Sequence, residues 1–336
     1  MAVTINFIGE LSSSNFGLKL SKIKISILYY FLIHIIKISR NHPLKRAFIQ
    51  LHFAVLLAGF TAILGKLILL NEALLTSYRM LLSAVILAAF LFLNKQLPIL
   101  SWKNTVRLFA VGAIISLHWV TFYGSIKYAN VSVSVTCLST IGFFTSFFEP
   151  LIMRRKVDFV EVLLGLLAVG GVYLIFNFYP QYKTGIAFGI ISAMLACIFP
   201  ILNKKLLRDF SPNTVTLYEM SGGFIALCFL LPVYLHFFPA AYYWPTYRDW
   251  LWLLILAGVC TVFAFNLSLN ALKHITAFTT NLTYNFEPVY SIILAFIIFK
   301  ENKFLGPGFY FGFTLILLAV TLQMMRVYQE KKTRKL

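Results

Sequence analysis

Ten long runs almost free of charge follow one another along this chain of 336 residues. A helix that crosses a bilayer needs about 20 mostly apolar residues, and each run meets or approaches that length. Charged residues make up 12% of the chain, whereas a soluble domain has about 25%. We therefore predict an all-α integral membrane protein with ten transmembrane helices. The predicted spans are residues 47–69, 73–93, 106–126, 131–152, 160–178, 184–203, 213–237, 250–271, 276–299 and 304–325.

The basic residues lie mostly in the short connections between these runs. Lys and Arg number 29 against 11 Asp and Glu, an excess that in a soluble protein would suggest nucleic acid, but no connection is long enough for a nucleic-acid-binding domain. Lys and Arg favour the cytoplasmic side of a membrane. If the chain crosses at every run, 22 of them fall on one side and six on the other, with Arg79 inside a run. Both termini are therefore expected in the cytoplasm.

The chain before the first run is a separate basic segment. Residues 25–36 are apolar, but they are too few to span a bilayer and are closely flanked by Lys24 and Lys37. We expect an interfacial helix here, because no small-residue cleavage site of a signal peptide follows. An extension from an upstream start is the alternative. The predicted organisation is a leader over 1–46, five-helix repeats over 47–178 and 184–325, and a basic cytoplasmic tail over 326–336.

The second half of the chain repeats the first. Ser125-Ile-Lys127-Tyr-Ala-Asn-Val131 resembles Ala271-Leu-Lys273-His-Ile-Thr-Ala277, 146 residues later. Tyr78-Arg79-Met80 resembles Tyr218-Glu219-Met220, 140 residues later, and the matches keep their order along the chain. Because each copy has five spans, the second copy enters the membrane from the opposite side. The sequence thus predicts two inverted repeats. Many secondary transporters are built this way, and their substrate site lies between the repeats near the membrane midplane.

Several motifs make the chain similar to the EamA-type drug/metabolite transporter superfamily over residues 47–325. They are the ten spans in two copies, Arg79 followed by Met-Leu-Leu-Ser-Ala, the small-x-x-Lys-aromatic turn before the fourth span, and Pro288 with Phe299-Lys300-Glu301. The chain departs from the family pattern at Lys156, where a Glu is usual, and at Gly142, which stands where the second copy has Pro288. The resemblance implies a secondary transporter that exports metabolites, amino acids or xenobiotics across a bacterial cytoplasmic membrane.

Four ionisable side chains lie inside the runs, where inserting a charge costs about 2.5–3.5 kcal/mol and a functional role is the first hypothesis: Arg79, Glu149, Glu219 and Glu287. Glu287 is at mid-depth, so we predict that it carries a coupled proton or holds a cationic group. Arg79 and Glu219 are predicted to take part in charge pairing within the membrane. Arg79 could equally reach the outer interface or contact substrate, and Glu219 could be a partner in helix packing.

The ninth span carries an unusual number of polar side chains. Thr280, Tyr284, Glu287 and Ser291 recur at helical spacing, and lipid would not tolerate the face they form. We therefore expect this face to line a polar cavity together with groups on other spans. Among those, His118 could change charge near neutral pH or serve as a neutral packing group. The predicted substrate-cavity residues are His118, Trp119, Tyr123, Asn203, Asn266, Asn270, Thr280, Tyr284 and Asn285.

The sequence has no Ser/His/Asp arrangement, no phosphate-binding Gly-rich loop and no cluster of metal-ligand residues. The four cysteines lie inside apolar runs without metal-ligand spacing, so we expect neither a metal nor a cofactor. We predict a secondary transporter for amphipathic or zwitterionic small molecules and not an enzyme. Its partners would be this substrate and the lipid bilayer, with no nucleic acid. The alternative is a membrane-embedded enzyme or a non-transporting assembly protein.

Two glycine pairs bear on oligomeric state. Gly185-x-x-x-Gly189 and Gly308-x-x-x-Gly312 allow helices to approach closely. Packing within the chain is their expected use, and a homodimer interface is the alternative.

Overall fold

A computed structural model describes residues 43–284 and 286–333, and in this part of the chain every regular element is a helix. The predicted all-helical membrane fold is confirmed there. Within residues 43–284 and 286–333, seven helical segments are long and apolar enough to cross a membrane, and three shorter apolar helices accompany them. Residues 1–42 of the predicted leader lie outside the described residues. The seven are Pro43–Leu67, Glu72–Leu93, Trp102–Tyr128, Val131–Met153, Pro180–Leu206, Pro212–Phe237 and Tyr247–His274, and the three are Phe159–Ile175, Glu287–Phe299 and Pro307–Gln323.

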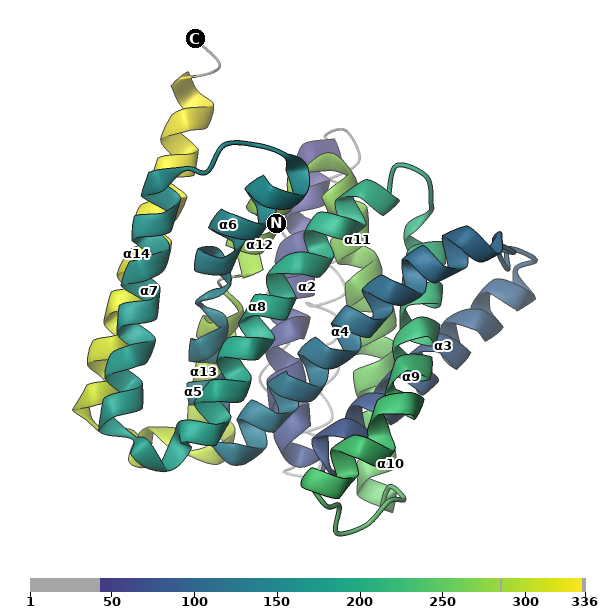
Figure 1. The fold of residues 1–336 in the computed structure, drawn as a ribbon, viewed down its shortest axis with the longest axis horizontal. Coiled ribbons are helices and arrows are strands. Elements are labelled where there is room, and N and C mark those ends of the chain that lie inside the picture. Colours follow the sequence, from purple (N-terminus) through teal and green to yellow (C-terminus); the bar gives the residue numbers. More distant parts are fainter. Residues whose placement is uncertain (1–42, 285, 334–336) are drawn as a thin grey trace, which may run out of the picture. The chain divides into compact units, whose positions relative to one another are not determined.

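The first half of the chain runs from purple to teal in Figure 1. Three of its helices begin at a polar side chain: Asn71, Asn130 and Asp158 each accept a hydrogen bond of 2.8–2.9 Å from a backbone N–H of the first turn. Such caps satisfy amide groups that have no partner inside the helix. The helices are α2 (Pro43–Leu67), α3 (Glu72–Leu93), α4 (Trp102–Tyr128), α5 (Val131–Leu138), α6 (Ile141–Met153) and α7 (Phe159–Phe178).

The second half continues from teal to yellow. The eighth predicted span is formed by three consecutive helical segments, because a π-helical stretch, η3, separates α10 from α11. In this stretch the Thr261 hydroxyl donates to the carbonyl of Leu256 at 2.7 Å. The helices are α8 (Lys183–Leu206), α9 (Pro212–Phe237), α10 (Tyr247–Ala257), η3 (Gly258–Phe263), α11 (Ala264–His274), α12 (Ala277–Tyr284), α13 (Glu287–Phe299) and α14 (Pro307–Thr333), with short 3₁₀ turns η2 (Pro180–Tyr182) and η4 (Glu301–Lys303).

Two of the predicted spans are broken in the middle. The span expected at 131–152 is divided into α5 and α6, and the span expected at 276–299 into α12 and α13. In the second case Pro288 lies directly after the break. It has no N–H to donate to the carbonyl of Tyr284, so a continuous helix would lose a hydrogen bond here. Broken helices of this kind are tolerated in membranes where they face protein or a cavity.

The two broken spans have the same construction. Every bound of α12 and α13 lies 146 residues after the matching bound of α5 and α6, which is the offset of the sequence repeat. Each pair also ends at a basic residue in the left-handed region, Arg154 and Lys300, both with φ of 55°. The same local fold therefore occurs once in each half of the chain.

Glycines let the helices approach closely. α4 packs against α8 and α9, and α7 packs against α14. A Cβ atom at Gly112 of α4 would collide with the backbone carbonyl of Glu219 on α9. Gly171 of α7 faces Gly312 of α14, and a Cβ at Gly171 would lie 2.5 Å from the Gly312 carbonyl oxygen. Gly312 therefore packs within the chain.

The carboxylate of Glu301 ties three segments together at one end of the bundle. Its Oε1 accepts a 2.7 Å hydrogen bond from Nζ of Lys66, at the end of α2. Its Oε2 accepts from the backbone N (2.9 Å) and the hydroxyl (2.7 Å) of Ser132, in the first turn of α5. Glu301 is 3% exposed. A carboxylate is favourable at this position because a helix N-terminus has free N–H groups and a partial positive charge.

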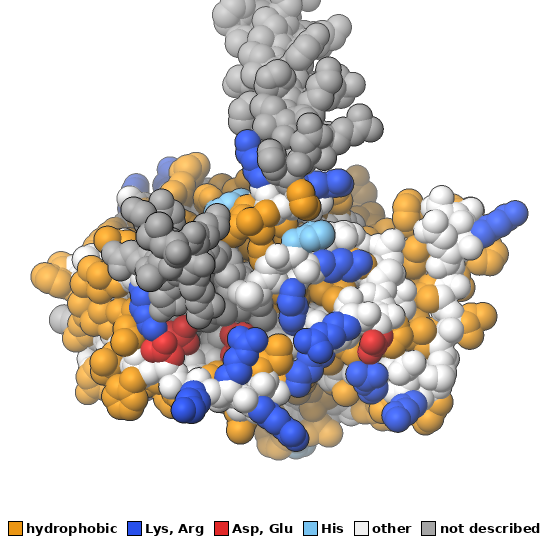
Figure 2. All heavy atoms as spheres, turned by 90° about the horizontal axis from the view of Figure 1, so that it is seen from above, with side chains coloured by type: hydrophobic (Ala, Val, Ile, Leu, Met, Phe, Trp, Pro, Cys, Tyr) orange, Lys and Arg blue, Asp and Glu red, His pale blue; other side chains and the backbone are white. Residues whose placement is uncertain are grey.

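The surface of the described residues has the character of a membrane protein. Large apolar side chains project from the helices, such as Phe229 of α9, which is 80% exposed, and Phe311 of α14, which is 71% exposed. Exposed apolar surface of this extent is typical of contact with lipid or another protein. Figure 2 looks onto one end of the molecule and shows many Lys and Arg side chains but few Asp or Glu. Such an end suits the polar headgroup region.

Candidate functional site

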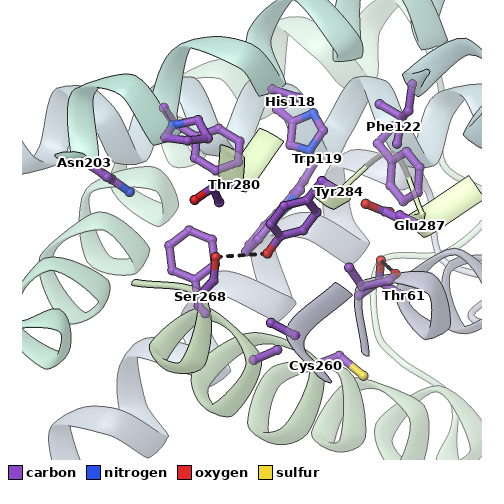
Figure 3. A pocket seen from close by; sticks show the side chains of 18 of the residues that line it. Thr61, His118, Trp119, Phe122, Asn203, Cys260, Ser268, Thr280, Tyr284 and Glu287 are labelled. Carbon is purple, nitrogen blue, oxygen red and sulfur yellow. Dashed lines mark hydrogen bonds between the residues drawn. The ribbon is translucent and has the colours of Figure 1, made fainter. Parts of the chain in front are cut away.

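Helices from both halves of the chain enclose a cavity of about 100 Å³ (Figure 3). A cavity of about 150 Å³ accommodates benzene, so a larger metabolite would require these helices to move apart. The lining is mostly apolar but includes two ionisable groups of opposite sign. The lining residues are Ala54, Ala58, Thr61, Arg79, His118, Trp119, Phe122, Leu138, Ile141, Ala196, Phe199, Pro200, Asn203, Cys260, Ala264, Phe265, Ser268, Leu269, Leu272, Thr280, Tyr284 and Glu287.

Aromatic rings form a connected wall of the cavity. The ring of Trp119 meets Phe265 edge-on, with centroids 6.4 Å apart, and Phe265 stacks on Phe199 at 6.1 Å. Phe199 in turn lies 5.7 Å from the imidazole of His118. Aromatic pairs at these distances attract each other beyond the simple burial of their area. The wall spans α4, α8 and α11, so it joins both halves of the chain.

Arg79 of α3 is the basic group of the cavity, and its guanidinium is held on three sides. Nε donates to the hydroxyl of Thr261 at 2.8 Å, and Nη1 donates to the hydroxyl of Tyr123 at 2.6 Å. Cζ lies 3.5 Å from the centroid of Trp119, a cation–π contact. Arg79 is only 3% exposed. Two hydrogen bonds and a stacked ring therefore fix the plane of this cation at the edge of the cavity.

Arg79 and Glu219 have different partners from those expected. Among the described residues, no ion pair involves either side chain. Oε2 of Glu219, on α9, accepts a long hydrogen bond of 3.4 Å from the amide of Asn203. Because η3 lies against α3, the hydroxyl of Thr261 accepts a hydrogen bond from Nε of Arg79. We predicted charge pairing for Arg79. In the structure its positive charge is stabilised by two hydroxyl groups and an indole ring.

Glu287 is the acidic group of the cavity. It is the first residue of α13, directly after the break in the ninth span, and it is 9% exposed. The helix N-terminus contributes a partial positive charge that favours a carboxylate. Thr280 and Tyr284 of α12 line the cavity with it, and the hydroxyl of Tyr284 donates to Ser268 of α11 at 3.1 Å (Figure 3).

The polar face predicted for the ninth span is interrupted. Thr280, Tyr284 and Glu287 line the cavity, but Ser291 does not, and its hydroxyl donates to the carbonyl of Gly59 at 3.2 Å. Helical spacing assumed one continuous helix. Because α12 ends at Tyr284 and α13 begins at Glu287, the spacing of one continuous helix does not carry over to Ser291.

His118 and Tyr123 of α4 occupy different positions relative to the cavity. His118 lines it, with Nδ1 3.0 Å from the carbonyl and 2.8 Å from the hydroxyl of Ser192 on α8. These contacts hold the imidazole against α8. Tyr123 is fully buried and is not part of the lining, but its hydroxyl accepts from Arg79. Trp119 and Asn203 both lie in the lining.

The predicted asparagines of the eighth span bond other amide groups. The amide of Asn266 donates to Asn213 of α9, and Asn270 donates to Asn266 Oδ1 at 2.7 Å. Neither side chain is in the lining of this cavity, and both belong to a chain of amide groups between α11 and α9. Asn285 lies outside the described residues.

Sequence reasoning missed several lining residues of the eighth span. Cys260, Ala264, Ser268 and Leu272 recur every four residues, and this is the face that meets the cavity. The spacing was visible in the sequence, but the side chains are small or apolar and gave no polar signal. Thr61 of α2 was missed for a different reason, since it is a single hydroxyl in an apolar helix. Among the described residues, no three His, Cys, Asp or Glu side chains come together as metal ligands.

Two relatives with similar sequences are named as transporters. A 26% identical relative, "Uncharacterized transporter YetK" of Bacillus subtilis (strain 168), matches over 269 residues, which is 76% of this chain and 80% of that protein. An "Uncharacterized transporter" of Archaeoglobus fulgidus is 27% identical over 177 residues, 52% of this chain and 62% of the relative, so less than two thirds of its length is spanned.

The fold is also found in a solved structure. One crystal structure superposes with a TM-score of 0.57 over 82% of this chain and 95% of that chain, at 15% sequence identity. At that identity the likeness concerns the fold alone. The sequence profile of the EamA-like transporter family matches this chain twice, over residues 45–177 and 183–325. These two matches cover most of the chain and confirm the resemblance inferred from its motifs: the chain belongs to the EamA-like transporter family.

Proposed function

We propose that this protein is a secondary transporter that exports small zwitterionic or amphipathic solutes, such as amino acids or drug-like molecules. The observation that carries the proposal is a buried cavity, with aromatic walls, that has one guanidinium and one carboxyl group in its lining, Arg79 and Glu287. The membrane transporter family gives the general activity. The direction of transport, export, rests on the family resemblance.

The two charged groups favour a zwitterion. A guanidinium is a planar, permanently charged donor that suits a carboxylate. The carboxylate of Glu287, which has the opposite charge, suits an ammonium group. The rings of Trp119, Phe199 and Phe265 suit an apolar side chain of the same solute. A phosphorylated substrate would bring two negative charges to a cavity with a single fixed cation. We therefore place zwitterionic solutes before phosphorylated ones.

The mechanism we propose is alternating access between two inverted five-helix repeats that together contain ten spans. The recurrence of the broken span at an offset of 146 residues supports a duplicated design. The small volume of the cavity supports a mechanism in which the surrounding helices separate to admit a larger solute. In this mechanism one repeat rocks against the other, and Arg79 and Glu287 meet the solute from α3 and α13, which belong to different repeats.

The proposed location is a bacterial cytoplasmic membrane with both termini in the cytoplasm. The distribution of Lys and Arg along the sequence supports this orientation, and so does the basic end seen in Figure 2. Glu287 is the proposed proton-coupling residue, since it is a carboxyl group in the lining of the cavity where solute would bind.

Transport by purified protein in liposomes tests the proposal. Three radiolabelled compounds of similar size are compared: phenylalanine, its methyl ester, which lacks the negative charge, and phenylpropionate, which lacks the positive one. We expect more counterflow of phenylalanine in these liposomes than in liposomes without the protein, and little counterflow of the other two compounds. No counterflow for any of a panel of amino acids and amphipathic drugs would contradict the transporter assignment, and equal movement of all three compounds would contradict the zwitterion preference.

A further inference from the structure

The turn between α6 and α7 corresponds to the turn after α13 but carries different side chains. Arg154 occupies the left-handed position that Lys300 occupies in the second copy, both with φ of 55°. In the second copy the next residue is Glu301, which is buried and accepts hydrogen bonds from Lys66 and from α5. In the first copy the next residue is Arg155, which is exposed. The turn between α6 and α7 therefore lacks the buried tie of its counterpart.

This turn carries three consecutive basic residues, Arg154, Arg155 and Lys156, which we call the basic triplet. All three are exposed, and none of them forms an ion pair with a described residue. The carboxyl group of Glu149 interacts electrostatically with Arg155, but Glu149 is buried. Three exposed positive charges against one buried acid leave a surface that attracts anions.

Neighbouring segments add to the positive charge of this surface. Nζ of Lys205 donates to the carbonyl of Ile152 at 2.9 Å, so the basic end of α8 lies beside the end of α6. The nearest acid along the chain, Asp158, is already paired with Arg326 of α14. The turn between α6 and α7 lies at the upper end of the bundle in Figure 1, the end onto which Figure 2 looks and where Lys and Arg predominate.

Large apolar side chains flank the basic triplet. Leu151, in the last turn of α6, and Phe159, the first residue of α7, are each 75% exposed, and Val157 between them is 50% exposed. Both helices are apolar segments of a membrane protein. Exposed apolar side chains at the ends of such helices meet lipid hydrocarbon close to the headgroups. The surface therefore combines cations with apolar side chains in a single turn.

A molecule that suits both parts of this surface carries a negative charge beside hydrocarbon chains. From this arrangement we infer that the turn between α6 and α7 binds an anionic phospholipid, with the phosphate at the basic triplet and the acyl chains along Leu151 and Phe159. Guanidinium groups can donate two parallel hydrogen bonds to a phosphate, which adds specificity to the attraction of charge. The inference depends on neither the transported solute nor the direction of transport.

Thermal unfolding of the full chain tests this binding without measuring transport. The protein is kept in an uncharged detergent, and phosphatidylglycerol or phosphatidylcholine with the same acyl chains is titrated into the micelles. A ligand that binds only the folded state raises the unfolding midpoint in a saturable way. We expect this rise with phosphatidylglycerol. Little or no rise is expected with phosphatidylcholine, which has no net charge, or with glycerol phosphate, which has no acyl chains.

A triple variant assigns the effect to the turn. Arg154→Gln/Arg155→Gln/Lys156→Gln removes the charge of the basic triplet. A basic residue at an anionic lipid surface contributes about a factor of five to binding, so the concentration of phosphatidylglycerol at half the rise should increase about a hundredfold. Because the three side chains are exposed, the midpoint without lipid should stay close to that of the wild type.

A second triple variant with the same loss of charge is the matched control. Lys95→Gln/Lys103→Gln/Lys273→Gln removes three exposed cations from the connection between α3 and α4, the first turn of α4 and the last turn of α11. It should change the concentration of phosphatidylglycerol at half the rise by no more than about fivefold, because only the general attraction of charge is reduced.

Three results would overturn the inference. One is an equal rise of the midpoint with phosphatidylglycerol and phosphatidylcholine. Another is an equal loss of affinity in the two triple variants, which would show that the whole basic end attracts lipid without a site at the turn. The third is a full rise with glycerol phosphate, which would identify a free phosphate ester as the ligand. Counterflow of solute is measured separately, so these results leave the transport proposal intact.

Discussion

The guanidinium carbon of Arg79 lies 3.5 Å from the ring centroid of Trp119, while Thr261 and Tyr123 accept hydrogen bonds from two of its nitrogens. Arg79→Lys keeps the positive charge but removes the planar group that stacks and donates in two fixed directions. We expect transport to fall about tenfold or more, since loss of roughly 1.4 kcal/mol corresponds to a factor of ten. Counterflow in liposomes is the measurement. Arg107→Lys, at an exposed side chain, is the matched control and should transport normally.

Glu287→Gln should separate proton coupling from solute binding. Gln has nearly the same shape at the start of α13 but cannot exchange a proton. Accumulation driven by a pH gradient should disappear, while counterflow without a gradient continues at a reduced rate because the ammonium partner is lost. Uptake is measured with and without the gradient. Accumulation equal to that of the wild type would remove Glu287 from the coupling mechanism.

Gly112→Ala should destabilise the fold, because the added Cβ would collide with the carbonyl of Glu219 on α9. Overpacking of this kind costs about 1–3 kcal/mol. Gly142→Ala, in α6, is the control: no atom lies within 4 Å of its added Cβ, and Ala favours a helix over Gly by about 1 kcal/mol. The two variants should therefore shift the unfolding temperature in detergent in opposite directions. An unchanged or higher unfolding temperature for Gly112→Ala would contradict the close packing of α4 and α9 at Gly112.

The connection between α6 and α7 gives a pH-dependent prediction. A hydrogen bond from Arg326 holds the pKa of Asp158 below its ordinary value of 3.8. A lowered pKa in the folded state stabilises the fold above pH 3.8, and this contribution disappears as the pH falls through the folded-state pKa. The side chain is 40% exposed, so the contribution is about 1 kcal/mol or less.

Two substitutions divide the role of Asp158 into charge and helix capping. Asp158→Asn keeps an oxygen for the N–H of Val160 but loses the charge, so it should unfold earlier than the wild type at about pH 7 and match it well below the folded-state pKa. Asp158→Ala also loses the cap and should cost about 1 kcal/mol more at both pH values. A difference between wild type and Asp158→Asn that persists in acid would contradict the assignment of the effect to charge.

The features that could be predicted from sequence are those that would be strongly unfavourable in a membrane without a specific structure around them. Arg79 and Glu287 were identifiable because a charge inside an apolar run is costly to insert into a membrane. Both side chains line the cavity. The helices themselves followed from the length of the apolar runs. The family followed from motifs that recur in order along two halves of one chain.

The features that could not be predicted depend on which side of a helix faces inward. Asn266 and Asn270 were chosen because they are polar, yet Ser268, almost opposite them around α11, meets the cavity. An amide that bonds another amide is satisfied wherever a partner is found, so polarity alone does not indicate a cavity. The prediction of one continuous ninth span did not include the break after α12, and Ser291, which follows the break, is not in the lining.

The tie made by Glu301 has no counterpart of the same sign in the other half of the chain. At the matching position, 146 residues earlier, stands Arg155, which is exposed. Separating α5 from Glu301 breaks several buried hydrogen bonds to a charged carboxylate. Separating the corresponding segments near Arg155 breaks no such buried bonds to that side chain, because Arg155 is exposed. In the alternating-access mechanism proposed above, two movements that duplication would make equal in energy would therefore be unequal, and one orientation of the repeats would be preferred at rest.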